Sequence, residues 1–173
     1  QNVITVPWNI IKVVRNKSGE LQYDFTEFDR YVNAYRAEDL DRLFCLQHMG
    51  GRTVGEWECP TFSSNSRTII NMQTGEDEYI DVIDTLSEIE KHISARGWLK
   101  NFCVHVGDEP IGVNEDSYRE LSARVHAAAP NLRRIDAIHV PDLNGSLEIW
   151  VPQINYLNQW LPQYRQAQAE GNE

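Results

Sequence analysis

The sequence predicts an α/β fold in which helices cover a parallel sheet. Five short apolar segments have the length and composition of strands, and segments with helical periodicity separate most of them. Several of the strands are hydrophobic without alternation, as expected where both faces of a parallel sheet are covered. The order along the chain therefore indicates repeated right-handed strand–helix–strand units within a single domain, residues 1–173.

Two strands and one helix are predicted in the N-terminal part of the chain. The β-branched run at 3–6 meets a proline, which cannot continue a hydrogen-bonded ladder, so the first strand ends near Trp8. Apolar and aromatic residues within 25–35 recur at intervals of three and four, which predicts a helix with Thr26 as its N-cap. The continuous apolar segment 43–48 predicts the second strand.

A long segment rich in Gly, Ser, Thr and Asn follows at 49–75, with a candidate strand at 68–70. A connection of this length inside a domain is usually functional or mobile, so a lid, a docking loop and a disordered insertion all stay open. Apolar residues at helical spacing then predict a long amphipathic helix over 79–98, ended at Gly97.

The C-terminal part repeats the same alternation. A third strand is predicted at 101–106, a helix at 114–130, strands at 134–140 and 147–151, and a final helix at 156–169. The first of these helices has Asn114 as its predicted N-cap, with acidic residues in its first turn.

Charge and motif content exclude several classes of function. The chain has 16 Lys and Arg against 26 Asp and Glu, and a net charge of -10 repels nucleic acid and anionic membrane surfaces. No apolar run reaches the roughly 20 residues of a membrane span, and no phosphate-binding loop is present. The cysteines Cys45, Cys59 and Cys103 are expected to be packing or surface residues, and no close pair of metal ligands occurs. We therefore predict neither cofactor nor metal.

Candidate site residues lie just after the predicted strands, because ligands of parallel α/β folds bind beyond the carboxyl ends of the strands. These residues are Trp8, Gln47, His48, Asp108, Glu109, His139, Trp150 and Gln153. The mixture of indole, amide, imidazole and carboxylate suits a sugar, because an indole covers its C–H face and polar groups bond its hydroxyls. Each tryptophan also has a structural interpretation as a cap on the core, the two histidines as rim residues, and His105 as a packing residue inside its strand.

The adjacent pair Asp108 and Glu109 ends an apolar strand. Two carboxylates so placed repel each other and lose hydration, which favours a proton on one of them near neutral pH, as a general acid requires. The alternative is that they decorate a loop ahead of a helix N-terminus, where acids are favoured. Adjacent strand residues point to opposite faces, so one shared site requires a break in the backbone, and Gly107 and Pro110 flank the pair where we expect it.

The order strand, Val-Gly-Asp-Glu-Pro, helix, strand and Ile-Trp-Val-Pro-Gln resembles the catalytic barrel of glycoside hydrolase family 123. The motifs are residues 106–110 and 149–153, and the resemblance extends from Val3 to about Tyr156. It implies a partial (β/α)8 TIM-type barrel with about five parallel strands. It also implies an oligosaccharide or glycoconjugate substrate and a secreted or periplasmic location.

The family it resembles removes β-linked N-acetylgalactosamine with retention, and the 2-acetamido group of the substrate is the nucleophile. By this resemblance Glu109 would be the general acid and base, and Asp108 would hold the acetamido N–H and stabilise the oxazolinium intermediate. Five residues would bind the sugar: Trp150, Gln153, Tyr156, His48 and Trp8.

The sequence departs from the family in extent. A complete barrel has eight strands in about 250 residues, so we expect a fragment that needs the missing barrel segments or self-associates through its exposed edge strands. The alternatives to a β-N-acetylhexosaminidase are a non-catalytic carbohydrate-binding or scaffold module derived from such a barrel, and an unrelated α/β hydrolase or regulatory domain.

Overall fold

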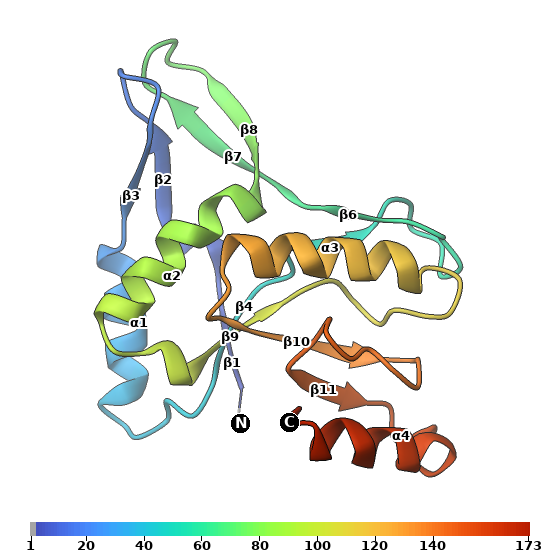
Figure 1. The fold of residues 1–173 in the computed structure, drawn as a ribbon. Helices are drawn as coiled ribbons and strands as arrows, with labels where there is room; N and C mark the ends of the chain where they lie inside the picture. Colours follow the sequence, from blue (N-terminus) through green and yellow to red (C-terminus); the bar gives the residue numbers. More distant parts are fainter. Residues whose placement is uncertain (1–2) are drawn as a thin grey trace.

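A computed structural model describes residues 3–173, and a five-stranded parallel sheet lies at its centre (Figure 1). The strand order is β1-β4-β9-β10-β11, and every neighbouring pair is parallel. The strands are β1 (Ile4–Val6), β4 (Phe44–Leu46), β9 (Phe102–His105), β10 (Arg133–Ile138) and β11 (Ile149–Pro152). All five predicted strands are thus confirmed, and they lie side by side in chain order. Because β1 and β11 are the two edges of this sheet, closure into a barrel stays a prediction.

Helices cover one face of this sheet. They are α1 (Thr26–Arg36), α2 (Leu86–Ala95), α3 (Glu115–Ala128) and α4 (Leu157–Ala169). Alternate strand residues such as Phe44, Phe102 and Val104 point into this layer and join helix residues such as Phe28 and Tyr118 in one hydrophobic core. Each of these five side chains is completely buried. Among residues 3–173, every helix falls short of the length and apolar character that crossing a bilayer requires.

The opposite face of the sheet carries a second, smaller apolar cluster. It consists of Cys45, Cys103, Ile135 and Ile149, and all three cysteines of the chain are buried free thiols. Above this cluster lies a hollow of about 350 Å³, here called the open-face hollow. Its wall includes Thr5, Gln47, His48, His105, Ala137 and Val151. This face therefore ends in polar groups at the carboxyl edge of the sheet.

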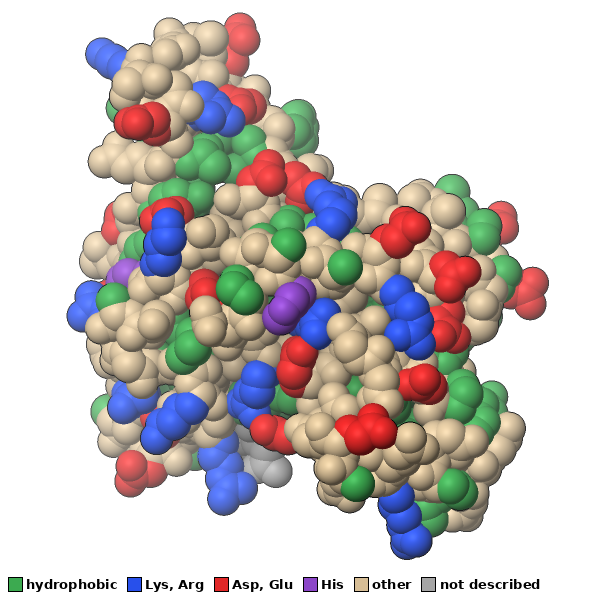
Figure 2. All heavy atoms as spheres, in the orientation of Figure 1, with side chains coloured by type: hydrophobic (Ala, Val, Ile, Leu, Met, Phe, Trp, Pro, Cys, Tyr) green, Lys and Arg blue, Asp and Glu red, His purple; other side chains and the backbone are tan. Residues whose placement is uncertain are grey.

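A second sheet was not predicted. Its order is β3-β2-β7-β8, with β2 (Lys12–Arg15), β3 (Leu21–Asp24), β7 (Ser66–Asn71) and β8 (Asp77–Asp81). It stands out from the body as a separate lobe in Figures 1 and 2, and acidic and basic side chains are interspersed over the face in Figure 2. Only the candidate strand at 68–70, which is part of β7, was expected there.

The helix predicted over 79–98 was placed too early in the chain. Residues Asp77–Asp81 form β8, a 3-10 helix spans Val82–Thr85, and α2 starts only at Leu86. Alternation explains the difference, because Tyr79 is 75% exposed whereas its neighbour Ile80 is buried. The carboxylate of Asp81 then accepts the N–H of Ile83 at 2.9 Å and ends the strand.

Of the two predicted N-caps, Thr26 is wrong and Asn114 is confirmed in position. The N–H of Thr26 is bonded by the side chain of Asp24 at 2.9 Å, so Asp24 supplies the cap interaction. Asn114 is the N-cap of α3, and its carbonyl accepts the N–H of Tyr118 at 2.9 Å. Its side chain makes no capping bond, because it accepts from the N–H of Ile111 and donates to the carbonyl of Cys59. The side chain of Asn114 therefore holds the preceding loop.

The segment 49–75 is folded. It contains the antiparallel hairpin of β5 (Gly50–Arg52) and β6 (Phe62–Ser64) as well as β7. The N–H groups of Met49 and Gly50 donate to the carbonyls of His105 and Val106, both at 2.9 Å. These bonds fasten the hairpin to the end of β9, next to the two predicted catalytic carboxylates.

Candidate active site

The site is centred on the turn at 107–110, directly after β9. Glu109 has φ of +48°, one of two positive values among the non-glycine residues described in 3–173. A left-handed conformation is strained for such a residue, and strained residues often cluster at functional sites. This is the backbone break expected between Gly107 and Pro110, and it turns Glu109 away from the regular alternation of β9.

Arg52 holds the turn from the β5–β6 hairpin. Its Nη1 donates to the carbonyl of Asp108 at 2.9 Å, and its Nη2 donates to the carbonyl of Glu109 at 2.8 Å. The Nε of the same guanidinium donates to the carbonyl of Trp57 at 2.9 Å. One planar group thus fixes both the strained turn and the loop that carries Trp57.

Asp136 holds the turn from the core side. Its carboxylate is fully buried, and Oδ2 accepts the N–H of Gly107 at 2.9 Å and the hydroxyl of Tyr118 at 2.8 Å. Its Oδ1 lies 3.1 Å from Nε2 of His105. Asp136 therefore connects β10, the end of β9 and α3.

The carboxylate of Glu109 meets two residues from neighbouring strand ends. Nε2 of Gln153 donates to its Oε1 at 3.1 Å, and Nε2 of His139 lies 3.4 Å from the same oxygen. The side chain of Glu109 is 29% exposed, so it reaches solvent while these groups orient it. The structure thus brings together Glu109, Gln153 and His139, three of the residues expected at the carboxyl edge.

A group of aromatic rings lies beside Glu109. The ring centroid of His139 lies 5.2 Å from that of Trp57 and 5.8 Å from that of Tyr156. Tyr156 in turn stacks on Trp160 at 4.9 Å. Trp57 is 48% exposed and Tyr156 is 37% exposed, so these two rings offer apolar surface to a ligand.

His48 and His105 form the other side of the site. Their ring centroids are 3.8 Å apart, and both rings line the open-face hollow. Burial and the neighbouring His105 lower the pKa of His48. Burial also opposes a charge on His105, but the carboxylate of Asp136, 3.1 Å from Nε2, outweighs it and raises the pKa of His105. The pair therefore binds a proton at His105 in preference to His48.

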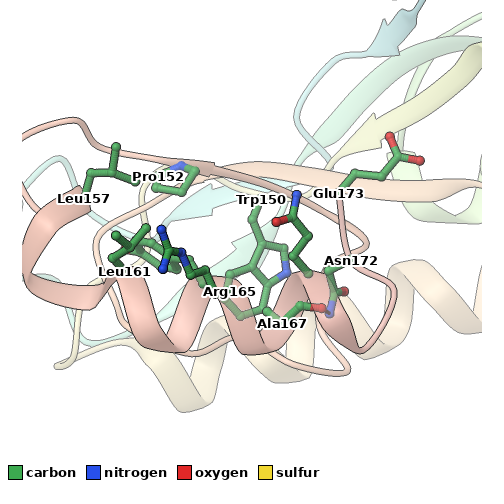
Figure 3. A pocket seen from close by; sticks show the side chains of 10 residues that line it. Trp150, Pro152, Leu157, Leu161, Arg165, Ala167, Asn172 and Glu173 are labelled. Atoms are coloured by element: carbon green, nitrogen blue, oxygen red, sulfur yellow. Dashed lines mark hydrogen bonds between the residues drawn. The ribbon is translucent and has the colours of Figure 1, made fainter.

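Two of the predicted sugar-binding residues lie elsewhere. Trp150 is buried beneath α4, where its Nε1 donates to the carbonyl of Leu147 at 3.2 Å and its ring packs edge-on against Tyr164. Figure 3 shows its side chain pointing from β11 toward α4, beside Arg165. Both residues line a groove of about 240 Å³. Trp8 packs on the main core, with the guanidinium carbon of Arg67 5.8 Å from its ring. Neither indole contacts Glu109.

A family model described as "Glycoside hydrolase 123, catalytic domain" matches residues 1–171 of the chain. The chain belongs to this family. A comparison with curated proteins found no match. The resemblance inferred from the motifs at 106–110 and 149–153 is therefore correct, and an unrelated hydrolase or regulatory domain is excluded as the family of this chain.

A solved structure of a family 123 glycoside hydrolase from Clostridium perfringens, described in terms of glycolipid glycan hydrolysis, has a similar fold. The TM-score is 0.62 at 14% sequence identity, which supports likeness of fold. The alignment covers 98% of this chain and 34% of the other chain. This family 123 chain thus spans about a third of the length of the solved chain.

Four residues of this candidate site were missed by the sequence analysis: Arg52, Trp57, Tyr118 and Asp136. Arg52 and Trp57 lie in the segment 49–75, whose composition indicated a loop and obscured its hairpin. Asp136 carried a signal, because it is an acid within the apolar strand at 134–140 and such a buried charge needs partners. His105 was interpreted as packing, whereas its ring contacts both Asp136 and His48. Within residues 3–173, no three His, Cys, Asp or Glu side chains are grouped as metal ligands.

Proposed function

We propose that this chain carries the catalytic carboxylates of a retaining β-N-acetylhexosaminidase, similar to a β-N-acetylgalactosaminidase, that works by substrate-assisted catalysis. The observation that carries the proposal is the left-handed turn at Glu109, which places two adjacent carboxylates at the carboxyl edge of a parallel sheet. Membership of family 123 supports a carbohydrate substrate. The remaining strands of a complete (β/α)8 barrel are part of this proposal.

Glu109 is proposed as the general acid and base. In the first step it gives its proton to the glycosidic oxygen while the bond from that oxygen to the anomeric carbon breaks. The acetamido oxygen of the substrate then bonds the anomeric carbon and forms an oxazolinium ion. In the second step the Glu109 carboxylate takes a proton from water, whose oxygen bonds the anomeric carbon as the ring opens. Gln153 supports this role because it donates to Oε1 at 3.1 Å and orients the carboxylate, and His139 lies 3.4 Å from the same oxygen.

Asp108 is proposed to bind the acetamido group. A carboxylate that accepts the acetamido N–H turns the acetamido oxygen toward the anomeric carbon and stabilises the positive charge of the oxazolinium ion. The two carboxylates have different neighbours. Asp108 acts electrostatically on His48 and His105, whereas Glu109 contacts Gln153 and His139. This asymmetry supports two different roles for the adjacent acids.

Sugar binding is proposed to use Trp57 and Tyr156 rather than Trp150 and Trp8. Trp57 and Tyr156 are partly exposed, and both rings lie near His139, which is next to the Glu109 carboxylate. An exposed aromatic face packs against the C–H face of a pyranose. Gln153 and His48 keep the binding roles proposed from the sequence, because both lie at the carboxyl edge of the sheet.

The decisive experiment measures hydrolysis of aryl β-N-acetylgalactosaminides by the chain and by a longer chain extended at both ends. Glu109→Gln should lower kcat by about 10²–10⁴-fold on a substrate with a poor leaving group. The loss should be much smaller with a nitrophenyl group, which leaves without protonation. Asp108→Asn should lower kcat with both substrates, because the acetamido oxygen displaces either leaving group.

The adjacent acids Glu115 and Asp116 in the first turn of α3 provide matched controls. Glu115→Gln and Asp116→Asn make the same chemical changes and should leave kcat unchanged. A substrate with a 2-hydroxyl in place of the 2-acetamido group should not turn over, and the first product should have the β configuration. If neither the chain nor the extended chain hydrolyses the substrate but both bind the sugar, the result would support the carbohydrate-binding module. If neither binds the sugar, the likeness to glycoside hydrolases would be one of fold only.

A further inference from the structure

We infer that Asp136 is a positioning residue, which presents Asp108 and Glu109 by holding the Gly107 N–H and which fixes the ring of His105 at the open-face hollow. This inference rests on the function proposed above. It assigns a role in the reaction to a residue that lies inside the core, away from solvent.

Burying a carboxylate at this place costs free energy unless other groups compensate for the lost hydration. Asp136 has no exposed surface, and an ionised group without water requires hydrogen bonds or an opposite charge. It has the Gly107 N–H, the Tyr118 hydroxyl and the nearby His105 imidazole. Within residues 3–173, His105 is the one basic side chain that forms an ion pair with it. All three partners lie in the turn at 107–110 or next to it.

The turn is held between two groups. On the core side, Asp136 fixes the N–H of Gly107, the residue immediately before Asp108. On the outer side, Arg52 fixes the carbonyls of Asp108 and Glu109. The strained φ of Glu109 lies between these two attachments. Loss of either attachment allows the peptide to relax and moves both carboxylates.

His105 extends the network to the ligand side of the sheet. Its Nε2 lies 3.1 Å from Oδ1 of Asp136, and its ring faces the open-face hollow next to His48. The titratable and charged groups that act on His105 are Asp136, Cys45 and Asp108, and it acts in turn on His48. Asp136 raises the pKa of His105, and Asp108 acts on His105 in the same direction.

A purely structural Asp136 would give stability without affecting the reaction, and two kinds of measurement separate these roles. NMR of the chain reports the amide proton of Gly107 and the titration of His105, and kinetics of the active form report kcat and KM. Asp136→Asn keeps the size of the side chain and removes its charge. Tyr118→Phe removes one hydrogen bond and retains the ring, so it serves if the first variant does not fold.

The matched control is Glu148→Gln. Glu148 is also a carboxylate paired with a buried cation, Arg134, but it lies at the start of β11, at the other end of the sheet. We expect this variant to lose stability and to leave kcat and the titration of His105 unchanged.

We expect Asp136→Asn to lower kcat by about 10²-fold, as for a displaced catalytic group, while KM changes by less than about threefold. We also expect the Gly107 amide resonance to shift and the pKa of His105 to fall. Full kcat together with a stability loss like that of Glu148→Gln would overturn the inference. If the wild-type enzyme hydrolyses no glycoside, the proposed function fails separately. An unchanged Gly107 amide and His105 titration in Asp136→Asn would then overturn the positioning network itself.

Discussion

Gly107 faces the ring of Phe62 so closely that a β-carbon at position 107 would lie 2.9 Å from Cε1 of Phe62. The same β-carbon would lie 3.3 Å from the ring of Tyr118. The turn that carries Asp108 and Glu109 is therefore pressed against the β6 strand and α3, and only a residue without a side chain allows this approach.

Gly107→Ala should therefore destabilise the protein by about 1–3 kcal/mol, as overpacking of a close contact does. Gly112→Ala is the matched control, because a β-carbon there has no neighbour within 4 Å and its φ is not positive. The control should be neutral or stabilise by up to about 1 kcal/mol. Urea unfolding of both variants checks this, and equal free energies of unfolding would refute the close approach.

The strain at Glu109 predicts an unusual order of stabilities. A left-handed conformation costs a residue with a β-carbon about 1–2 kcal/mol, so Glu109→Gly should be at least as stable as Glu109→Ala. At the exposed helical residue Glu120, the order should reverse, with Gly about 0.5–1 kcal/mol less stable than Ala. Thermal unfolding of the four variants tests this. An alanine variant at 109 clearly more stable than the glycine variant would mean that the turn is unstrained.

Arg52 should control how tightly the turn is held. Arg52→Ala removes the donors to the carbonyls of Asp108 and Glu109, and hydrogen bonds from a charged group contribute about 1.5–3 kcal/mol. We expect faster hydrogen exchange at residues 108–112 and lower activity, with only partial recovery in Arg52→Lys, because an ammonium cannot reproduce the planar fork. Arg30→Ala is the control, since its side chain is 78% exposed and its helical pair with Glu27 contributes little. Unchanged hydrogen exchange at residues 108–112 in Arg52→Ala would show that Arg52 does not hold the turn.

The sequence was sufficient for the central sheet and for part of the site. Continuous apolar segments identified the five parallel strands, and the glycine and proline around Asp108 and Glu109 indicated the break that the positive φ of Glu109 supplies. Gln153 and Tyr156 follow the last strand, and both lie at the site, Gln153 against Glu109 and Tyr156 against His139.

The other features of the fold and of the site could not be recognised from the sequence, for physical reasons. The strands β2 and β3 have four residues each and largely exposed outer faces. The alternation of buried and exposed residues therefore extends over too few positions to be recognised in the sequence. Exposed Tyr79 made β8 look like the start of a helix. Asp136 could be recognised as a buried acid, but its partners Gly107 and Tyr118 are 29 and 18 residues away and meet it only in the fold.

The pair of histidines predicts how stability depends on pH. The pKa of His105 is raised in the folded protein, chiefly because Asp136 outweighs the effect of burial. The folded state therefore binds a proton that the unfolded state releases above pH of about 6.5, so this stabilisation is complete below that pH and is lost as pH rises through the folded pKa. His48 has a lowered pKa, so its contribution has the opposite sign and is lost as pH falls toward its folded pKa.

Urea unfolding of the wild-type chain and of His105→Gln, measured from pH 5 to pH 9, tests this. The variant should be less stable at low pH and should lose less stability between about pH 6.5 and pH 8 than the wild type, because the proton held between His105 and Asp136 is absent. His48→Gln should instead remove part of the decline toward low pH. His126→Gln, on the exposed side of α3, should leave the profile unchanged. If His105→Gln has the same alkaline slope as the wild type, the pKa of His105 is not raised in the folded state, and His105 and Asp136 do not form an ion pair.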